Sequence, residues 1–177
     1  IDKKQLADLK IICLVLKHTE AEAKAIYKEK YHKELEYLAQ SEKRNKYIRN
    51  LATALNGNTL ILFQLVEKHG KDLYELIRTK AGDRKVFFVY GGVDAEQRER
   101  VREITEKTDN SIIVASYGTF STGINIRNLH NIIFASPSKS RIRNLQSIGR
   151  GLRIGDSKEA ATLYDISDDL TYKEKKN

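Results

Sequence analysis

Short apolar runs alternate with helical segments from Asn58 onward, and this alternation narrows the possible folds more than any other feature of the chain. The runs typical of buried strands lie at 59–63, 85–90, 111–115, 130–135 and 161–165. Helical spacing occupies 66–80, 94–107 and 138–152, and the last of these begins just after Pro137. Near-continuous apolar strands separated by helices are typical of a parallel sheet that is covered on both faces. The sequence therefore predicts an α/β domain over 57–166.

The first 56 residues follow a different pattern. An apolar run at 9–16 predicts a strand at the edge of the sheet, and the segment 20–40 is charged, alanine-rich and helical. A second helix is predicted over 41–55, ending at Asn56 and Gly57. The chain is thus predicted to have an N-terminal strand and helical segment (1–56) packing on the α/β domain, and a charged tail (167–177) after it.

Length and cysteine content exclude several classes of protein. The 177 residues correspond to one domain, and no apolar run reaches the roughly 18 residues that a membrane span needs, so no membrane partner is expected. A single cysteine, Cys13, excludes an internal disulfide framework and a multi-cysteine zinc site, and it indicates a reducing compartment, the cytoplasm. Because Cys13 lies in an apolar run, it is expected to be a buried small side chain.

Basic side chains are concentrated in one part of the chain. The whole sequence carries a net charge of +8, and 111–155 contains six basic residues and no acidic one. This segment predicts a positive surface that faces an anionic partner, either nucleotide phosphate or nucleic-acid backbone. A solvated basic face is the alternative interpretation.

The most specific motif spans 146–153. On a helix, Arg150 and Arg153 lie one turn apart and form a fork suited to the terminal phosphate of a nucleoside triphosphate. Gly149 and Gly151 each cost about 1 kcal/mol relative to alanine inside a helix, which indicates that something approaches the backbone closely. Taken alone, the motif also suits an ordinary amphipathic helix with basic exposed side chains.

A second motif follows the strand predicted at 111–115. The segment 115–126 carries four Ser or Thr hydroxyls and two glycines. At the carboxyl end of a parallel strand it suits an anion-binding loop, or equally a strand-to-helix turn that Ser and Thr cap. Gly91 and Gly92 follow the strand at 85–90 in the same way, although a glycine pair alone usually makes only a turn.

Together, in this order and spacing, these motifs resemble the second RecA-like domain of superfamily 2 helicases and translocases. The residues that carry the resemblance are Gln146, Gly149, Arg150 and Arg153 (motif VI), Ser116 to Ile126 with Thr122 to Asn125 (motif V), 59–63 (motif IV) and Tyr90 to Gly92 with Arg98. Segments 118–126 and 136–140 are similar to the UvsW-type recombination helicases of T4-like phages. The resemblance covers 57–166 and implies a RecA-like three-layer domain, with a mainly parallel central sheet covered by helices on both faces.

The resemblance also implies roles for individual residues. Arg150 and Arg153 would be catalytic and reach the ATP γ-phosphate, with Arg153 as the arginine finger. Gln146, Gly123 and Asn125 would bind the nucleotide. The DNA backbone would be held by Thr119 and Thr122, together with the protein backbone near Phe63, Gln64, Gly91 and Gly92. Asn125 stands where many members have Asp, and Gln146 replaces the His of the DEAD-box branch, which argues against that RNA-directed branch.

Two elements of a complete motor are missing from the sequence. No Gly-x-x-x-x-Gly-Lys-Ser/Thr loop occurs, and no Asp-Glu-x-His follows a strand. ATP and Mg²⁺ would therefore be bound mainly by an N-terminal RecA-like domain of the same protein, and this chain alone is expected not to hydrolyse ATP. The start at Ile1 and the absence of methionine indicate an internal piece of a longer protein.

Three functions remain open from the sequence. The first is the C-terminal motor domain of an ATP-dependent DNA helicase that acts on single-stranded or branched DNA, in the host cytoplasm if a phage encodes it. The second is a stand-alone, catalytically inactive nucleic-acid-binding module. The third is the translocase subunit of a restriction enzyme. The four histidines show no ligand spacing. Asp165, Asp168 and Asp169 could form a metal cluster, but an acidic turn after the last strand is favoured.

Overall fold

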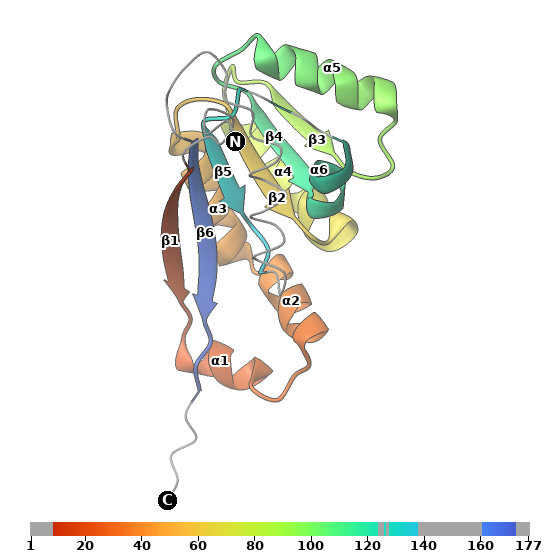
Figure 1. Cartoon of the computed structure of the whole chain (residues 1–177). Helices are drawn as coiled ribbons and strands as arrows, with labels where there is room; N and C mark the ends of the chain where they lie inside the picture. Colours follow the sequence, from red (N-terminus) through yellow and green to blue (C-terminus); the bar gives the residue numbers. More distant parts are fainter. Residues whose placement is uncertain (1–8, 124–125, 127, 138–160, 173–177) are drawn as a thin grey trace, which may run out of the picture.

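The computed structural model describes residues 9–123, 126, 128–137 and 161–172. In this part of the chain, six strands form one sheet in which every neighbouring pair is parallel, in the order β1-β6-β5-β2-β4-β3 (Figure 1). The strands are β1 (Leu9–Lys17), β2 (Thr59–Phe63), β3 (Val86–Val89), β4 (Ile112–Ser116), β5 (Asn131–Phe134) and β6 (Ala161–Asp169). The strand at 9–16 was predicted at the sheet edge, and β1 occupies that position.

Helices cover both faces of the sheet, which confirms the predicted three-layer α/β architecture. They are α1 (Glu20–Ile26), α2 (Tyr31–Gln40), α3 (Glu42–Ala54), the π-helical turn η2 (Val66–Gly70), α4 (Lys71–Lys80), α5 (Ala95–Glu106) and α6 (Tyr117–Gly123). On one face, Ile48 of α3 and Ile77 of α4 enter the apolar cluster. On the other, Val101 of α5 and Phe120 of α6 do so.

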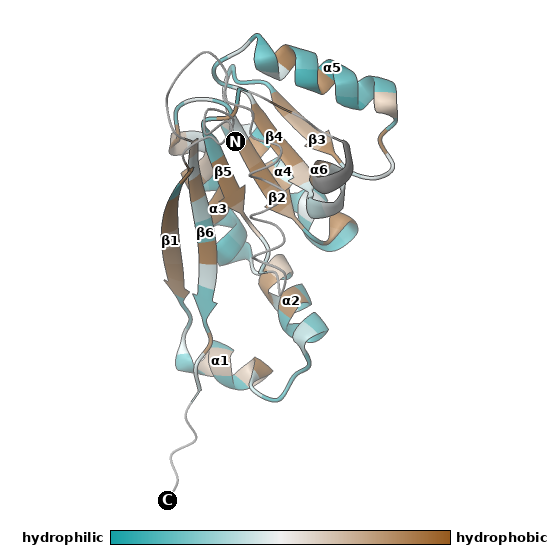
Figure 2. Ribbon diagram, viewed as in Figure 1, coloured by the Kyte–Doolittle hydropathy of each residue, from teal (hydrophilic) through white to brown (hydrophobic). Residues whose placement is uncertain are grey.

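The central strands are apolar along their whole length because both of their faces are covered. No residue of β2 is more than 1% exposed, and β4 and β5 are nearly as deeply buried. Figure 2 shows these strands mostly in brown, the colour of hydrophobic residues, as it also shows edge strand β1. This burial explains why 59–63 reads as a continuous apolar run rather than an alternating one.

Edge strand β1 shows the opposite behaviour and corrects one prediction. Its exposure alternates along the strand, with Ile11 and Val15 50% and 60% exposed. Cys13 lies between them on the same face and is exposed, so the prediction of a buried thiol was wrong. An apolar run alone does not distinguish an edge strand, which is covered on one face, from a central strand.

The helix predicted over 20–40 is broken into α1 and α2 by residues 27–30. Ile26 is buried in α1, and Leu35 is buried in α2. At about 100° per residue, these positions would face opposite sides of one continuous helix. The break lets each half bury its own apolar side. No glycine or proline marks it in the sequence.

The segment predicted as a helix over 66–80 begins with the π-helical turn η2, in which the Gly70 amide donates to the Leu65 carbonyl. Gly70 is required by close packing, because a Cβ there would lie 2.4 Å from Cζ of Phe63. The turn leaves His69 completely buried. A π-turn is rare and is often found at functional positions.

The last strand is longer than predicted. Strand β6 continues to Asp169 because Ser167, Asp168 and Asp169 pair with the end of β1. The predicted acidic turn was therefore wrong, and 167–169 belong to the sheet instead of the predicted charged tail (167–177). The helix predicted over 138–152 lies outside the described residues. Within the part that the structure describes, no helix is long and apolar enough to cross a membrane.

Candidate nucleic-acid interface

The predicted DNA-binding residues follow the carboxyl ends of neighbouring strands. Because all six strands are parallel, these ends share one edge of the sheet, which we call the carboxyl edge. Gln64 follows β2, Gly91 and Gly92 follow β3, and Thr119 lies in α6, directly after β4. Ligands of open α/β sheets bind outside this edge.

The exposure of these residues differs. Gly91 and Gly92 are exposed, and a Cβ on Gly91 would meet no atom within 4 Å. Phe63 is buried, and its ring stacks on Phe88 with centroids 5.7 Å apart. The Gln64 side chain is exposed, but its backbone amide already donates to Oγ of Ser136 over 3.1 Å. Only the backbone at Phe63 and Gln64 was predicted to touch DNA, so the burial of the ring leaves that prediction open.

Within the motif 115–126, residues 117–123 form helix α6 directly after β4, as expected for a strand-to-helix turn, and anion binding there stays a prediction. Oγ of Ser116 accepts from the Thr119 amide at 3.4 Å and lies 2.7 Å from Oγ1 of Thr119. Thr119 is 3% exposed, so its hydroxyl is held within the chain. Thr122 and Gly123 belong to α6 as backbone, and Asn125 lies outside the described residues.

The Tyr117 hydroxyl connects this helix to the next strand end. It donates to the Ser136 carbonyl over 2.9 Å, and its ring packs edge-on against Phe134. The ends of β2, β4 and β5 are therefore joined through residues around Ser136.

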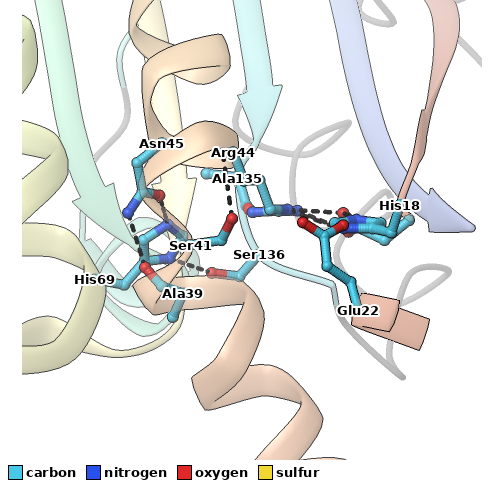
Figure 3. A network of polar contacts seen from close by, with 10 residues as sticks. His18, Glu22, Ala39, Ser41, Arg44, Asn45, His69, Ala135 and Ser136 are labelled. Atoms are coloured by element: carbon cyan, nitrogen blue, oxygen red, sulfur yellow. Dashed lines mark hydrogen bonds and ion pairs between the residues drawn. The ribbon is translucent and has the colours of Figure 1, made fainter. Parts of the chain in front are cut away.

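A chain of hydrogen bonds extends from Ser136 into the N-terminal helices (Figure 3). Nδ1 of His69 lies 3.1 Å from Oγ of Ser136, and Nε2 lies 3.0 Å from Oδ1 of Asn45. The side-chain amide nitrogen (Nδ2) of Asn45 donates to the Ala39 carbonyl. Because Oδ1 of Asn45 can only accept, Nε2 of His69 carries the proton and Nδ1 accepts from Ser136. The Ser136 oxygen is then free to accept from the Gln64 amide.

His69 is held in its neutral form. Burial, and secondly the positive charge of Arg44, lower its pKa from 6.5 to about 3. A charged imidazolium would lose the Ser136 hydrogen bond, since both ring nitrogens would then donate.

A buried ionic cluster completes the network on the other side of α3. Nε of Arg44 donates to Oδ1 of Asp168 over 2.9 Å, and its NH1 group donates to the Ala135 carbonyl. Nε2 of His18 lies 2.9 Å from the same Oδ1, and Nδ1 lies 3.3 Å from Glu22. Figure 3 shows His18 and His69 at opposite ends of the network, with Arg44 between them. The cluster joins α3, β1, β5 and β6 at the carboxyl edge.

Sequence analysis missed this network. Apart from the bond from Asn45 to Ala39, its hydrogen bonds join residues from 24 to 150 positions apart, and no local pattern marks such pairs. The only available signal was Asp168, whose carboxylate pairs with Arg44 and His18 instead of a metal. No three His, Cys, Asp or Glu side chains gather in a metal-binding arrangement within the described ranges.

Several predicted residues cannot be placed against this geometry. Gln146, Arg150 and Arg153 lie outside the described residues, as do all six basic residues of 111–155. The chain enters that region directly after Pro137, next to Ser136 at the carboxyl edge.

We expect the free energy of unfolding to depend on pH through His69. The unfolded chain takes up a proton below its ordinary pKa of 6.5, and the folded chain does so only near pH 3. Stability is therefore full above pH 6.5 and is lost as the pH falls toward 3, by at most about 1.4 kcal/mol per pH unit. The measurement is urea unfolding at several pH values for the wild type and His69→Gln.

His69→Gln is expected to be less stable than the wild type at pH 7.5, and this difference is expected to shrink as the pH falls. His32→Gln is the control, because His32 is an exposed residue of α2. A difference that stays constant between pH 7.5 and pH 4.5 would show that His69 is not held neutral by burial.

Comparison with known proteins agrees with this architecture. Residues 42–155 match the model of the helicase conserved C-terminal domain. The chain is 38% identical over 174 residues to the ATP-dependent DNA helicase uvsW of Enterobacteria phage T4, covering 97% of this chain and 34% of that protein. It thus spans about a third of this relative's length.

Comparison with solved structures also finds helicase and ATPase domains of similar fold. The crystal structure of T4 UvsW superimposes with a TM-score of 0.82 at 38% identity, over 94% of this chain and 34% of that one. The C-terminal part of the Fun30 ATPase domain is similar in fold alone, with a TM-score of 0.58 at 16% identity over 75% of this chain and 43% of that one. The family model covers more than half of the chain and the T4 relative nearly all of it, so the chain belongs to the helicase C-terminal domain family of superfamily 2.

Proposed function

We propose that this chain is the C-terminal motor domain of an ATP-dependent DNA helicase or translocase that acts in recombination, branch migration or fork repair. The observation that carries the proposal is the 38% identity to the T4 DNA helicase across 97% of the chain. The carboxyl edge supports it, because exposed glycines follow β3 at the position where such sheets bind ligands.

On the nucleotide side, Arg150 and Arg153 contact the γ-phosphate of ATP, with Arg153 as the arginine finger. A planar guanidinium on the transferring phosphoryl group stabilises charge that develops in the transition state. Gln146, Gly123 and Asn125 position the nucleotide. The region that contains the two arginines starts next to Ser136, so it enters from the carboxyl edge.

The described residues do not fit a Mg²⁺ site of their own. Their carboxylates form no three-residue group with metal-binding geometry, and Asp168 is already neutralised by Arg44. The metal and most of the nucleotide therefore belong to an N-terminal RecA-like domain of the same protein, and this chain supplies the arginines.

On the DNA side, the backbone at Gly91 and Gly92 is the part of the predicted surface best able to meet phosphates, because both residues are exposed and open space surrounds Gly91, while the Tyr90 ring lies beside Gly92. Gln64 directly follows β2, and Thr122 lies in α6, which follows the neighbouring strand β4. Phe63 and Thr119 are buried, so their side chains do not meet DNA directly. Contacts of this kind carry no base information, so no sequence preference is expected.

The test is DNA binding and ATP hydrolysis by the 177-residue chain. We expect weak binding to a labelled oligonucleotide with a log–log salt slope of about −2 to −3, corresponding to about three phosphates. We expect no phosphate release with or without DNA, since the phosphate-binding loop is missing.

Gly91→Glu adds a negative charge in open space at the predicted surface and should weaken binding severalfold. Ala54→Glu adds the same charge at an exposed position near the opposite edge of the sheet and should have little effect. Equal effects of the two variants would remove the carboxyl edge as the DNA site. ATP hydrolysis by the 177-residue chain that persists through further purification would contradict the proposal that another domain binds Mg-ATP.

A further inference from the structure

A cleft of about 670 Å³ lies between the end of β1 and the first turns of α3. Leu16, Lys17, Lys43 and Tyr47 are among the residues that line it. Both β1 and α3 meet the carboxyl edge here, but at the β1 end of the sheet, three strands from β2. The cleft is therefore separate from the loops after β2, β3 and β4 that form the predicted DNA surface.

Only some of the charged side chains that line the cleft form ion pairs. Arg44 is neutralised by Asp168, and Lys46 pairs with Glu42 over 2.7 Å. Lys17 and Lys43 form no ion pair among the described residues, and both are exposed. Glu42 is the only carboxylate among the described residues of the lining. Glu22 and Asp169 act on Lys43 and Lys17 from outside the lining but form no ion pair with them, so both exposed ammonium groups remain accessible to an anion.

Apolar side chains accompany these charges. Leu16 and Tyr47 line the cleft and are half-buried, and both pack against the apolar cluster on the α3 side of the sheet. The volume falls within the roughly 300–1,000 Å³ of sites that enclose a small organic ligand. A ligand with a flat apolar part can therefore enter the cleft as well as contact the lysines.

We propose that this cleft is a second nucleic-acid contact, in which Lys17 and Lys43 bind phosphates of a single strand and Tyr47 contacts a base or sugar. Lysine-bordered grooves with an aromatic side chain are how proteins hold single strands without reading sequence. An acidic peptide would match the lysines but leave the aromatic side chain without a partner. The inference rests on the proposal that the chain acts on DNA, and it adds a site outside the predicted residues.

The test uses Lys17→Glu/Lys43→Glu and a labelled oligothymidylate, with binding followed by fluorescence anisotropy at several salt concentrations. We expect at least tenfold weaker binding at physiological salt, where the control variant is also measured. We also expect a log–log salt slope that is less negative by about 1.4, because two phosphate contacts on a single strand are lost.

Lys85→Glu/Lys107→Glu is the matched control. It makes the same change in net charge with two exposed lysines that lie just before β3 and just after α5, near the opposite edge of the sheet. At physiological salt, charges more than about 8 Å away are screened, so this variant should change affinity less than twofold. Thermal unfolding of both variants checks that the fold is intact.

The position of the bound DNA on the protein is tested directly by photocrosslinking an oligonucleotide that carries 5-iododeoxyuridine. A crosslink to Tyr47, found by mass spectrometry, is expected. Crosslinks only at other tyrosines, or a Lys17→Glu/Lys43→Glu variant that binds DNA like the wild type, would overturn the cleft site and leave the proposed function standing.

Two further outcomes separate the two proposals. If the wild-type chain binds no DNA, the proposed DNA contact at the carboxyl edge fails together with the cleft site. If polyglutamate binds through Lys17 and Lys43 while oligothymidylate affinity is unchanged in the variant, the cleft is a peptide site and the inference is wrong.

Discussion

Arg153→Ala in the full-length parent protein is expected to lower kcat for DNA-stimulated ATP hydrolysis by roughly 10³-fold or more. An arginine that acts on charge developing in the transition state affects kcat, whereas DNA binding and the fold should be largely unchanged. Arg153→Lys should recover little activity, because an ammonium cannot reproduce the planar guanidinium. Steady-state ATPase kinetics with saturating DNA, together with anisotropy for DNA binding, measure both quantities.

Arg141→Ala is the matched control for this experiment. Arg141 falls among the apolar positions of the predicted helical wheel, away from the arc of Arg150 and Arg153. Its replacement removes the same charge and should leave kcat close to that of the wild type. Near-normal turnover in Arg153→Ala would mean that motif VI has been misassigned, and a stand-alone binding module would then explain the chain better.

The second large effect is on stability. Arg44→Met is expected to lower the free energy of unfolding by about 3–5 kcal/mol, because it leaves the Asp168 carboxylate buried without its main partner. The Asp168 side chain is only 3% exposed and that of Arg44 only 1%, so water cannot replace the lost contact. Urea unfolding at pH 7.5 measures the loss.

A double variant distinguishes the cost of leaving the Asp168 charge unpaired from the cost of losing the other contacts of the Arg44 side chain. Arg44→Met/Asp168→Leu removes both charges and should be more stable than Arg44→Met alone, since no buried charge is left unpaired. Arg78→Met, which breaks an exposed pair with Glu75 on α4, serves as the control and should unfold like the wild type. A double variant as unstable as Arg44→Met would show that the guanidinium stabilises mainly through its bond to Ala135.

The central strands were predictable because a strand that is buried on both faces has a continuous apolar run in its sequence. The same rule failed for Cys13, because an edge strand has one covered face and the run does not say which residues point outward. The break between α1 and α2 was missed because its cause is a change in the phase of the apolar positions, not a breaking residue.

The candidate site was only partly predictable for a different reason. Gly91 and Gly92 could be found because their motif is local and follows a recognisable strand. The partners of His69 could not, because Asn45 and Ser136 are common polar residues that meet only in the folded chain. Similarly, only the structure shows that the Thr119 hydroxyl is turned onto Ser116.

The pairing of β1 with β6 has a consequence for the order in which the chain can fold during synthesis. Of the six described strands, β1 leaves the ribosome first, yet the only one of them that pairs with it is β6, about 150 residues later. Until that strand emerges, the backbone edge of β1 is unpaired, and Arg44 and His18 lack their carboxylate. Pairings of such long sequence separation form slowly and leave an exposed edge open to aggregation. The nascent N-terminal segment is thus the part of this domain with the greatest need of chaperone protection, and its final docking has to wait for the C-terminal strand.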